Sequence, residues 1–242
     1  MRLFLLSLIV LNLFCLPAWA ARPLATEDPG VCGKGVSQLE VDGNYSWQDG
    51  SRDYALVVVP IYGFADNLEF SIELPYKLVR PAGGLGNEGF SDANLVLKTL
   101  FINECPTNPA FLIKSVVKLA SGNQPSGLGS GDVDLGFVAV AGKAFGPLMV
   151  NANLGYTFVG RKANPTLNNY ILYAISSEYF LTDKFKLVSE LYGEQNHHYD
   201  TGSFIHRASN SLIGMTYQLG GNTIVDVAVR SSSATAGLTL NI

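Results

Sequence analysis

Alternation of apolar and polar residues, repeated in segments of about ten residues, constrains this chain more than any other feature of its sequence. Leu68, Phe70 and Ile72, for example, alternate with Glu69 and Ser71. The same alternation recurs over residues 38–47, 111–119 and 148–158. Successive side chains of a β-strand point to opposite faces, so each segment has one apolar face and one polar face. The pattern predicts an all-β chain.

Turn signals divide the chain into about twelve such segments. They cover residues 36–47, 54–63, 67–78, 92–102, 110–120, 132–143, 148–159, 170–181, 184–194, 207–219, 223–230 and 236–242. Most have the length that a tilted strand needs to cross a bilayer. The connections are mostly long after odd-numbered segments and mostly short after even-numbered ones. We therefore expect a transmembrane antiparallel β-barrel of about 12 strands, with both termini in the periplasm.

The first residues have the layout of a secretory signal peptide. Arg2 precedes an apolar run over residues 3–16, and Ala18-Trp19-Ala20 forms a small-x-small cleavage site. The run is shorter than a spanning helix needs, which makes a membrane anchor the weaker alternative. We expect cleavage after Ala20 and export to the outer membrane of a Gram-negative bacterium. The expected divisions are a signal peptide over residues 1–20, a periplasmic segment over 21–35 and a barrel over 36–242.

Composition excludes two other classes of protein. The 242-residue chain is 48% hydrophobic and 15% charged, and its net charge is -4. This balance excludes a disordered chain, and the lack of basic clusters in the sequence argues against a nucleic-acid partner. The mean hydropathy of +0.21 is high for a secreted soluble protein. A soluble β-sandwich remains as the alternative to a membrane barrel.

Charged residues on the polar faces of the segments are the candidate lumen residues. A lysine that faces hydrocarbon at mid-membrane costs about 2–4 kcal/mol, and an acidic residue costs less. We therefore expect the following side chains to line the lumen: Glu40, Asp42, Glu69, Glu73, Lys77, Lys98, Lys114, Lys118, Glu178, Lys186, Glu190 and Asp226. Two interpretations stay open. The lumen is either a wet channel with a constriction of mixed charge or a salt-bridged plug that only stabilises the barrel.

The segment over residues 54–64 departs from the alternation because it is apolar on both faces. Its Pro60 cannot donate a hydrogen bond to a neighbouring strand, so we expect a bulge or a break in pairing there. Val57, Val59 and Ile61 form a candidate apolar patch on the lumen wall and a lateral weak point for an apolar solute. The alternative is that this patch contacts an inward-folded loop or the N-terminal segment.

Two cysteines, Cys32 and Cys105, would remain after removal of the signal peptide. Cysteines of an exported chain commonly pair. The expected topology places both at the periplasmic end of the barrel. We therefore predict a Cys32–Cys105 disulfide, with two free thiols as the alternative.

Motifs that could carry catalysis or bind a cofactor are weak in this sequence. His206 and Ser209 are three residues apart, which places them on opposite faces of a strand. The pair His197-His198 falls in an expected surface loop and is a weak metal signal. The glycine-rich stretches 83–86 and 127–131 lack the Lys-Ser/Thr ending of a phosphate-binding loop. We expect a protein that is not an enzyme and has no metal or cofactor; a lipid-modifying outer-membrane enzyme is the weaker alternative.

Several short blocks occur in a familiar order. They are Ala21–Gly30, Phe64–Tyr76 with its ending Glu73-Leu74-Pro75-Tyr76, Ser91–Lys98, Lys118–Gly122 and Gly129–Gly136. In this order they resemble the bacterial outer-membrane family named after the meta-pathway of phenol degradation. The resemblance implies a monomeric outer-membrane barrel that passes small, often aromatic, organic solutes, and it supplies no catalytic residues.

Together these observations predict a passive outer-membrane channel for small organic, aromatic or hydrophobic solutes. The loops over residues 79–91 and 121–131 are expected to restrict access. Its partners would be outer-membrane lipid, the solute and the outer-membrane assembly machinery. The C-terminal residues Leu238, Leu240 and Ile242 keep the alternation but lack the final aromatic residue that this machinery usually recognises. The alternative function is a structural or surface-interaction barrel with a closed lumen.

Overall fold

The structure is a computed structural model that describes residues 24–48, 50–163, 165, 167–196, 206–220, 222–230 and 233–241. The expected signal peptide and the pair His197-His198 lie outside the described residues. Over the described ranges, no helix has the length and apolar character needed to span a membrane.

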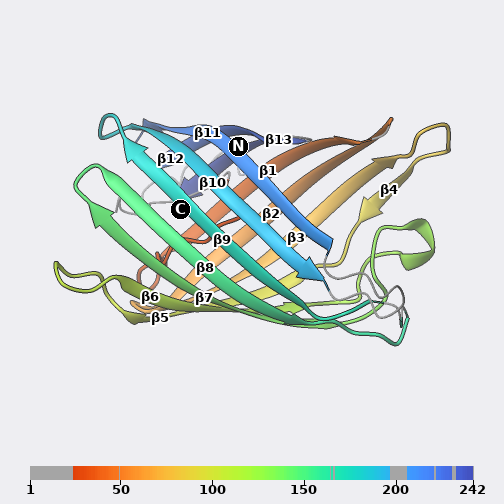
Figure 1. The fold of residues 1–242 in the computed structure, drawn as a ribbon, viewed down its shortest axis with the longest axis horizontal. Coiled ribbons are helices and arrows are strands. Elements are labelled where there is room, and N and C mark those ends of the chain that lie inside the picture. Colours follow the sequence, from red (N-terminus) through yellow and green to blue (C-terminus); the bar gives the residue numbers. More distant parts are fainter. Residues whose placement is uncertain are drawn as a thin grey trace, which may run out of the picture.

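Antiparallel strands make up most of the described chain, with one short 3-10 helix, η1 (Gln124–Ser126). The strands are β1 (Ser37–Gln48), β2 (Ser51–Ala65), β3 (Leu68–Arg80), β4 (Asn87–Phe90), β5 (Asn94–Ile102), β6 (Ala110–Lys118), β7 (Asp134–Phe145), β8 (Leu148–Phe158), β9 (Tyr170–Phe180), β10 (Phe185–Asn196), β11 (His206–Gly220), β12 (Thr223–Arg230) and β13 (Ser233–Asn241). They are tilted and wrap around one interior (Figure 1).

Twelve of these strands close into one barrel. β1 pairs with both β2 and β13, and the β2–β3 and β3–β5 pairings complete the ring. β4 is an additional short strand that pairs with the end of β3 and extends that hairpin past the barrel wall (Figure 1). The predicted twelve-strand barrel is confirmed. A single closed sheet also rules out the β-sandwich alternative.

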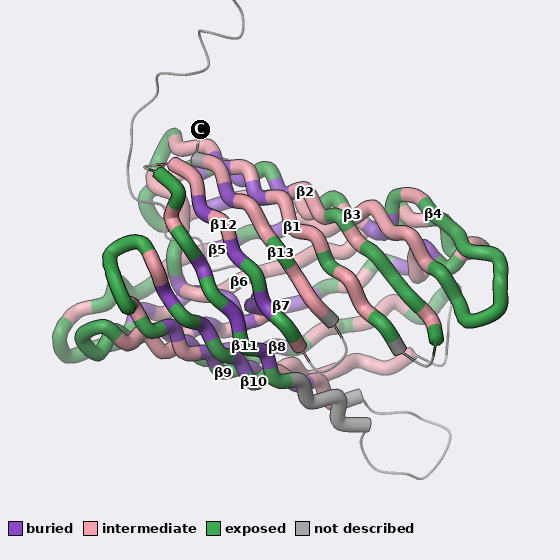
Figure 2. The backbone as a smooth tube through the Cα atoms, turned by 90° about the horizontal axis from the view of Figure 1, so that it is seen from above, coloured by how far each residue is buried: buried purple, intermediate pink, exposed green. Residues whose placement is uncertain are grey.

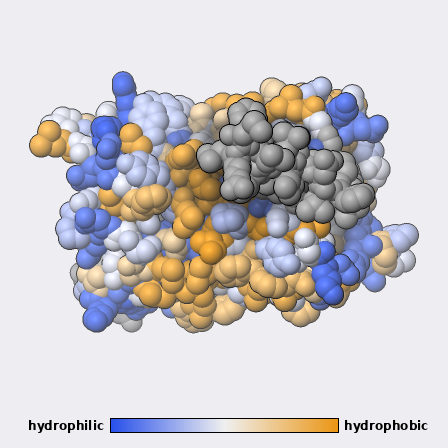
Figure 3. Space-filling model, turned by 180° about the vertical axis from the view of Figure 1, so that it is seen from behind, coloured by the Kyte–Doolittle hydropathy of each residue, from blue (hydrophilic) through white to orange (hydrophobic). Residues whose placement is uncertain are grey.

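Burial along the strands follows the alternation in the sequence (Figure 2). On β8, Asn151 and Asn153 are buried, whereas Leu154 and Tyr156 are exposed. Polar residues therefore face the interior and apolar residues face outward, which is the reverse of a soluble protein. One face of the molecule shows a hydrophobic middle between two hydrophilic ends (Figure 3). This surface suits a barrel that lies in a bilayer.

The two ends of the barrel differ in their connections. Short connections over residues 66–67, 103–109, 146–147 and 181–184 lie at one end, called here the turn end. Longer connections over residues 81–93, which include β4, and over residues 119–133 and 159–169 lie at the other end, called the loop end. This alternation agrees with the prediction from the sequence.

The first connection differs from the prediction, which placed a longer loop over residues 48–53. The β1–β2 pairing instead continues to Gln48 opposite Ser51, so a tight turn joins the two strands. Gly50 in this turn has a φ of 82°, a backbone conformation that glycine adopts without the steric cost of a side chain.

Candidate transport lumen

The structure places all twelve predicted lumen residues on the inward phase of their strands. Glu40, Glu69, Lys98, Glu178, Lys186, Glu190 and Asp226 are buried. Asp42, Glu73, Lys77, Lys114 and Lys118 are half-buried. Positive and negative side chains occur on the same inner wall, so most of them lie close to a side chain of opposite charge.

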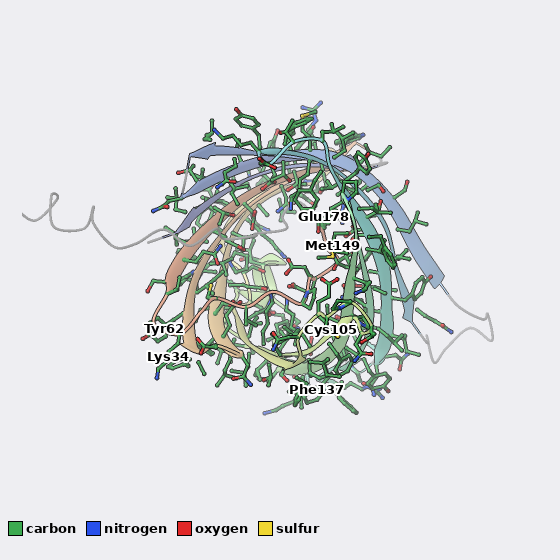
Figure 4. The ribbon with its side chains drawn as sticks, turned by 90° about the vertical axis from the view of Figure 1, so that its left-hand side faces the viewer. Lys34, Tyr62, Cys105, Phe137, Met149 and Glu178 are labelled. Atoms are coloured by element: carbon green, nitrogen blue, oxygen red, sulfur yellow. The ribbon has the colours of Figure 1, made fainter. Side chains whose placement is uncertain are left out.

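An N-terminal segment, residues 24–36, crosses this lumen. Gly35 N–H donates to the Gly63 carbonyl at 2.8 Å and Gly63 N–H donates to the Val36 carbonyl at 3.0 Å, which fixes one end of the segment to β2. At the other end, Leu24 forms a buried apolar cluster with Val188, Leu212 and Ala228 of β10, β11 and β12. Figure 4, viewed from the turn end, shows the segment running across the interior. The segment therefore lies inside the barrel; the sequence predicted a periplasmic segment and offered an inward contact of the N-terminal segment only as an alternative.

Glu27 is the central charged residue of this segment and is 7% exposed. Its Oε2 lies 3.0 Å from Lys98 Nζ, and its Oε1 pairs with Lys114 Nζ. Its backbone N–H donates to Asn153 Oδ1 at 2.7 Å, and its carbonyl accepts from Asn153 Nδ2 at 3.0 Å. The wall therefore holds both the side chain and the backbone of Glu27.

The two lysines that hold Glu27 also face acidic residues on the wall. Lys98 Nζ lies 3.9 Å from a carboxylate oxygen of Glu69, and Lys114 Nζ lies 3.6 Å from one of Glu73. Glu69 also accepts a hydrogen bond of 2.6 Å from the backbone N–H of Cys32. The ion pairs thus link β3, β5 and β6 to the segment in one network.

A second anchor lies on the opposite wall. The backbone N–H and the hydroxyl of Thr26 donate to Glu190 Oε2 at 2.5 and 2.8 Å. Glu190 Oε1 pairs with Arg230 at 3.2 Å. Further along the wall, Glu178 pairs with Lys186 and accepts a hydrogen bond of 3.1 Å from Asn151. Glu190 therefore joins the segment to β10 and β12.

Asp42, Gly237 and Asp226 lie side by side on β1, β13 and β12. A Cβ atom at position 237 would lie 2.7 Å from Asp42 Oδ1 and 2.6 Å from Asp226 Oδ2. Glycine at this position therefore leaves space for the two carboxylates. Glu40 lies one inward position away on β1, opposite Thr239.

Asp92, between β4 and β5, holds a loop that the sequence predicted to restrict access. Asp92 Oδ1 accepts from Gly122 N–H at 2.8 Å, and Oδ2 accepts from Ser130 N–H at 2.7 Å. Lys118 Nζ lies 3.8 Å from Asp92 and 2.6 Å from Asp134. These contacts fasten both ends of the loop over residues 121–131 to the loop end of the barrel.

The contacts of Asp92 with this loop should weaken at low pH. Burial by itself would raise the pKa of Asp92, but hydrogen bonds from Ser130 and Gly122 outweigh it and keep the pKa below its usual value. A lowered pKa stabilises the folded loop above about pH 4, and this contribution is lost as the pH falls through the folded pKa. We expect protease cleavage within residues 121–131 to accelerate below about pH 4. Asp92→Asn should be cleaved rapidly at neutral pH also, and equal cleavage of both proteins at neutral pH would contradict this role.

The apolar patch predicted on β2 faces inward. Val59 and Ile61 are buried and Val57 is half-buried. The β2–β3 register is the same before and after Pro60, and pairing is interrupted between Val58 and Ile61. The structure therefore has a break at Pro60, and the register shift of these strands lies nearer the turn, between Gly63 and Ala65.

The predicted Cys32–Cys105 disulfide is absent, and both cysteines are free thiols in the structure. Cys32 lies in the N-terminal segment, where its Sγ donates to Gln38 Oε1 at 2.9 Å. Cys105 lies in the β5–β6 turn, with Thr107 Oγ1 at 3.3 Å from its Sγ. The two cysteines belong to different elements at the turn end, one inside the barrel and one in its rim.

The two thiols should differ in reactivity. Burial, together with the carboxylate of Glu69, raises the pKa of Cys32 to about 12. Hydrogen bonds from Thr107 lower the pKa of Cys105. Because the thiolate is the reactive form, a water-soluble maleimide at pH 7.5 should label Cys105 at least about tenfold faster than Cys32. Mass spectrometry of the labelled peptides measures both rates, and a chain that accepts no label without reductant would contradict the free thiols.

Sequence reasoning missed the residues of the N-terminal segment that bind the wall. Thr26 and Glu27 precede the first strand and belong to no alternating pattern. Asn153 lies on the polar face of the alternating segment 148–158, and nothing in that pattern indicates its partner. The excess of inward lysines on two adjacent segments, Lys98, Lys114 and Lys118, was the available signal that an acidic partner comes from elsewhere in the chain.

Comparisons with known proteins identify the fold. No family model and no curated protein matches this chain, so the resemblance to the phenol meta-pathway family is not confirmed. Among solved structures, an outer-membrane channel from Pseudomonas putida F1 matches 90% of this chain and 100% of its own, with a TM-score of 0.70 and 10% identity. This chain has an outer-membrane β-barrel fold. The KdgM porin in complex with disordered oligogalacturonate also matches this barrel, over 84% of this chain and 97% of its own, with a TM-score of 0.52 and 12% identity.

Proposed function

We propose that this chain is an outer-membrane channel for passive passage of small organic solutes, and that its N-terminal segment forms the constriction. The apolar outer surface suits a bilayer, and the inner wall carries charged and polar residues. The similar solved structures are a channel and a porin. The fold alone does not assign a function, whereas the occupation of the lumen bears on it directly.

The observation that carries this proposal is the way in which the lumen is obstructed. A single extended segment crosses it, fastened by ion pairs at Glu27 and hydrogen bonds at Thr26. In a barrel that is permanently closed, such as an eight-strand barrel, the side chains of the strands themselves fill the interior. A segment that is attached at a few polar points can shift while the wall stays intact.

The wider proposal follows the expectations from the sequence. The protein would be monomeric, would be inserted by the outer-membrane assembly machinery and would keep both termini in the periplasm. It would act as a channel and not as an enzyme. Aromatic or hydrophobic solutes are the preferred class from the sequence; of the inward patch Val57, Val59 and Ile61, only the half-buried Val57 leaves apolar surface for them.

The ion pairs at Glu27 also favour a second candidate function, a barrel with a closed lumen that serves structure or surface interaction. Liposome swelling separates the two. Liposomes that contain the folded chain should swell in a series of uncharged organic solutes, with rates that fall as solute size rises. Empty liposomes are the control. A folded barrel that permits no swelling, with or without its N-terminal segment, would favour the closed-lumen function.

A further inference from the structure

Two adjoining cavities lie inside the turn end of the barrel. The larger has a volume of about 760 Å³ and is bordered by the β7–β8, β9–β10 and β11–β12 ends. The smaller, about 380 Å³, is bordered by Asp28–Val31 of the N-terminal segment. Both are lined by Met149, Phe180 and Lys186, so they lie next to each other. Figure 4 shows Met149 and Glu178 pointing into the interior at this end.

The larger cavity is mostly apolar, unlike most of the inner wall. Its lining includes Pro147, Met149, Phe180, Leu181, Phe185 and Ile224, together with the charged Asp183, Lys184 and Lys186. Apolar surface of this kind favours an apolar body over water, by about 25 cal/mol for each Å² that is buried. The volume lies within the range of small-molecule sites. The cavity therefore suits a ligand with an apolar body.

Thr216 supplies a polar group at the inner edge of the larger cavity. It is 3% exposed, and its hydroxyl has no hydrogen-bond partner in the described chain. A buried hydroxyl without a partner destabilises the protein by about 1–3 kcal/mol. Rotation about the Cα–Cβ bond can turn this hydroxyl toward the cavity, since more than one rotamer is common in strands. A hydroxyl group on a ligand can form a hydrogen bond with the Thr216 hydroxyl, either as the donor or as the acceptor.

The charges beside Thr216 and along the smaller cavity disfavour a charged group at the Thr216 hydroxyl. Lys186 lies opposite Thr216 in the β10–β11 pairing, so a cationic group at Thr216 would meet another cation. Lys186 is already paired with Glu178 and is not available to an anion. Asp28, Asp66 and Glu104 line the smaller cavity and would repel an anion that approached through it.

We propose that this turn-end cavity is a binding site for an uncharged amphiphile, with its apolar body among Met149, Phe180 and Ile224 and its hydroxyl group at Thr216. The inference deepens the proposed function and rests on it for the role of the site, which is to hold the solute at one mouth of the channel. Binding itself does not depend on passage.

Equilibrium dialysis of the barrel in lipid nanodiscs tests the site with three probes that share one ring system. They are 1-naphthol, 1-naphthoate and 1-naphthylmethylammonium, which are neutral, anionic and cationic at neutral pH. We expect saturable binding of 1-naphthol above that of empty nanodiscs, and at least about tenfold weaker binding of both charged probes. Thr216→Val should weaken 1-naphthol binding about 5- to 10-fold, the effect of one hydrogen bond.

Matched variants distinguish the site from general effects. Ala144→Phe adds a ring to the cavity lining and should abolish binding, whereas Ala152→Phe adds the same ring at an exposed position outside the cavity and should leave binding unchanged. Ser176→Ala is the control for Thr216→Val, because Ser176 also carries a buried hydroxyl without a partner but does not line either cavity.

The site is overturned if the folded barrel shows no saturable binding of 1-naphthol, if a charged probe binds as tightly, or if Thr216→Val and Ala144→Phe bind like the unchanged protein. Ionic current and binding are measured separately. Current without binding would overturn this inference and leave the proposed function standing. Binding without current or solute flux would support the site and contradict the channel.

Discussion

Deletion of residues 21–31 should raise the single-channel conductance of the refolded barrel several-fold. The deleted stretch includes Leu24, Thr26 and Glu27, which fasten the N-terminal segment to opposite walls of the lumen. Without it, the wall of twelve strands remains but the crossing segment is lost. Loss of Leu24 burial costs about 2 kcal/mol and loss of the Glu27 ion pairs about 3 kcal/mol, which a barrel with a complete ring of strand pairings should tolerate. Planar-bilayer recordings of the two proteins measure the difference.

The control for this deletion must separate the effect of the space that the segment occupies from the effect of the charges that it carries. Residues 21–31 contain Arg22, Glu27 and Asp28, so the deletion also removes one net negative charge. The triple variant Arg22→Gln/Glu27→Gln/Asp28→Asn removes the same three charges while the segment keeps its length. We expect a smaller rise in conductance from this variant than from the deletion. Equal conductance of the deleted and unchanged proteins, both folded, would mean that the segment is not the constriction.

Glu27→Gln should reduce the free energy of unfolding by about 3 kcal/mol, because removal of one partner leaves buried charge less well compensated. The Glu27 side chain is 8% exposed, and it faces Lys98 and Lys114 with side-chain exposures of 10% and 12%. The same variant should shift ion selectivity toward anions. Denaturant unfolding in lipid vesicles measures stability, and reversal potentials in a salt gradient measure selectivity.

Glu104→Gln is the matched control for Glu27→Gln. Glu104 pairs with Lys143 at 3.2 Å in the turn end, where the side chains are 30% and 22% exposed. An ion pair that water reaches contributes less than about 1 kcal/mol. Similar losses from Glu27→Gln and Glu104→Gln would contradict the view that Glu27 is the buried attachment of the segment.

The barrel could be predicted from the sequence because its two faces have opposite environments. The alternation of Asn151 and Asn153 with Leu154 and Tyr156 is needed for a wall with a polar lumen on one side and lipid on the other. A slip of one residue would turn every side chain to the wrong face. The same rule placed Lys98 and Glu178 on the inner wall, although it could not tell which charges would meet.

The occupation of the lumen could not be predicted, because no periodic pattern encodes it. Thr26 meets Glu190 across 164 positions of sequence, and that contact depends on the closed barrel bringing β10 to the segment. The contacts of Asp92 with the loop over residues 121–131, and the cavity beside Thr216, likewise depend on strands that only the closed barrel brings together. The disulfide prediction was wrong for a related reason, since location at one end of a barrel does not bring two cysteines into contact.

The most direct test is planar-bilayer conductance of the refolded chain over residues 21–242, with heat-dependent migration on a gel as evidence that the barrel is folded. We expect discrete current steps that increase in size when residues 21–31 are deleted. No current from a folded barrel, either intact or without those residues, would contradict the claim that this chain is a channel.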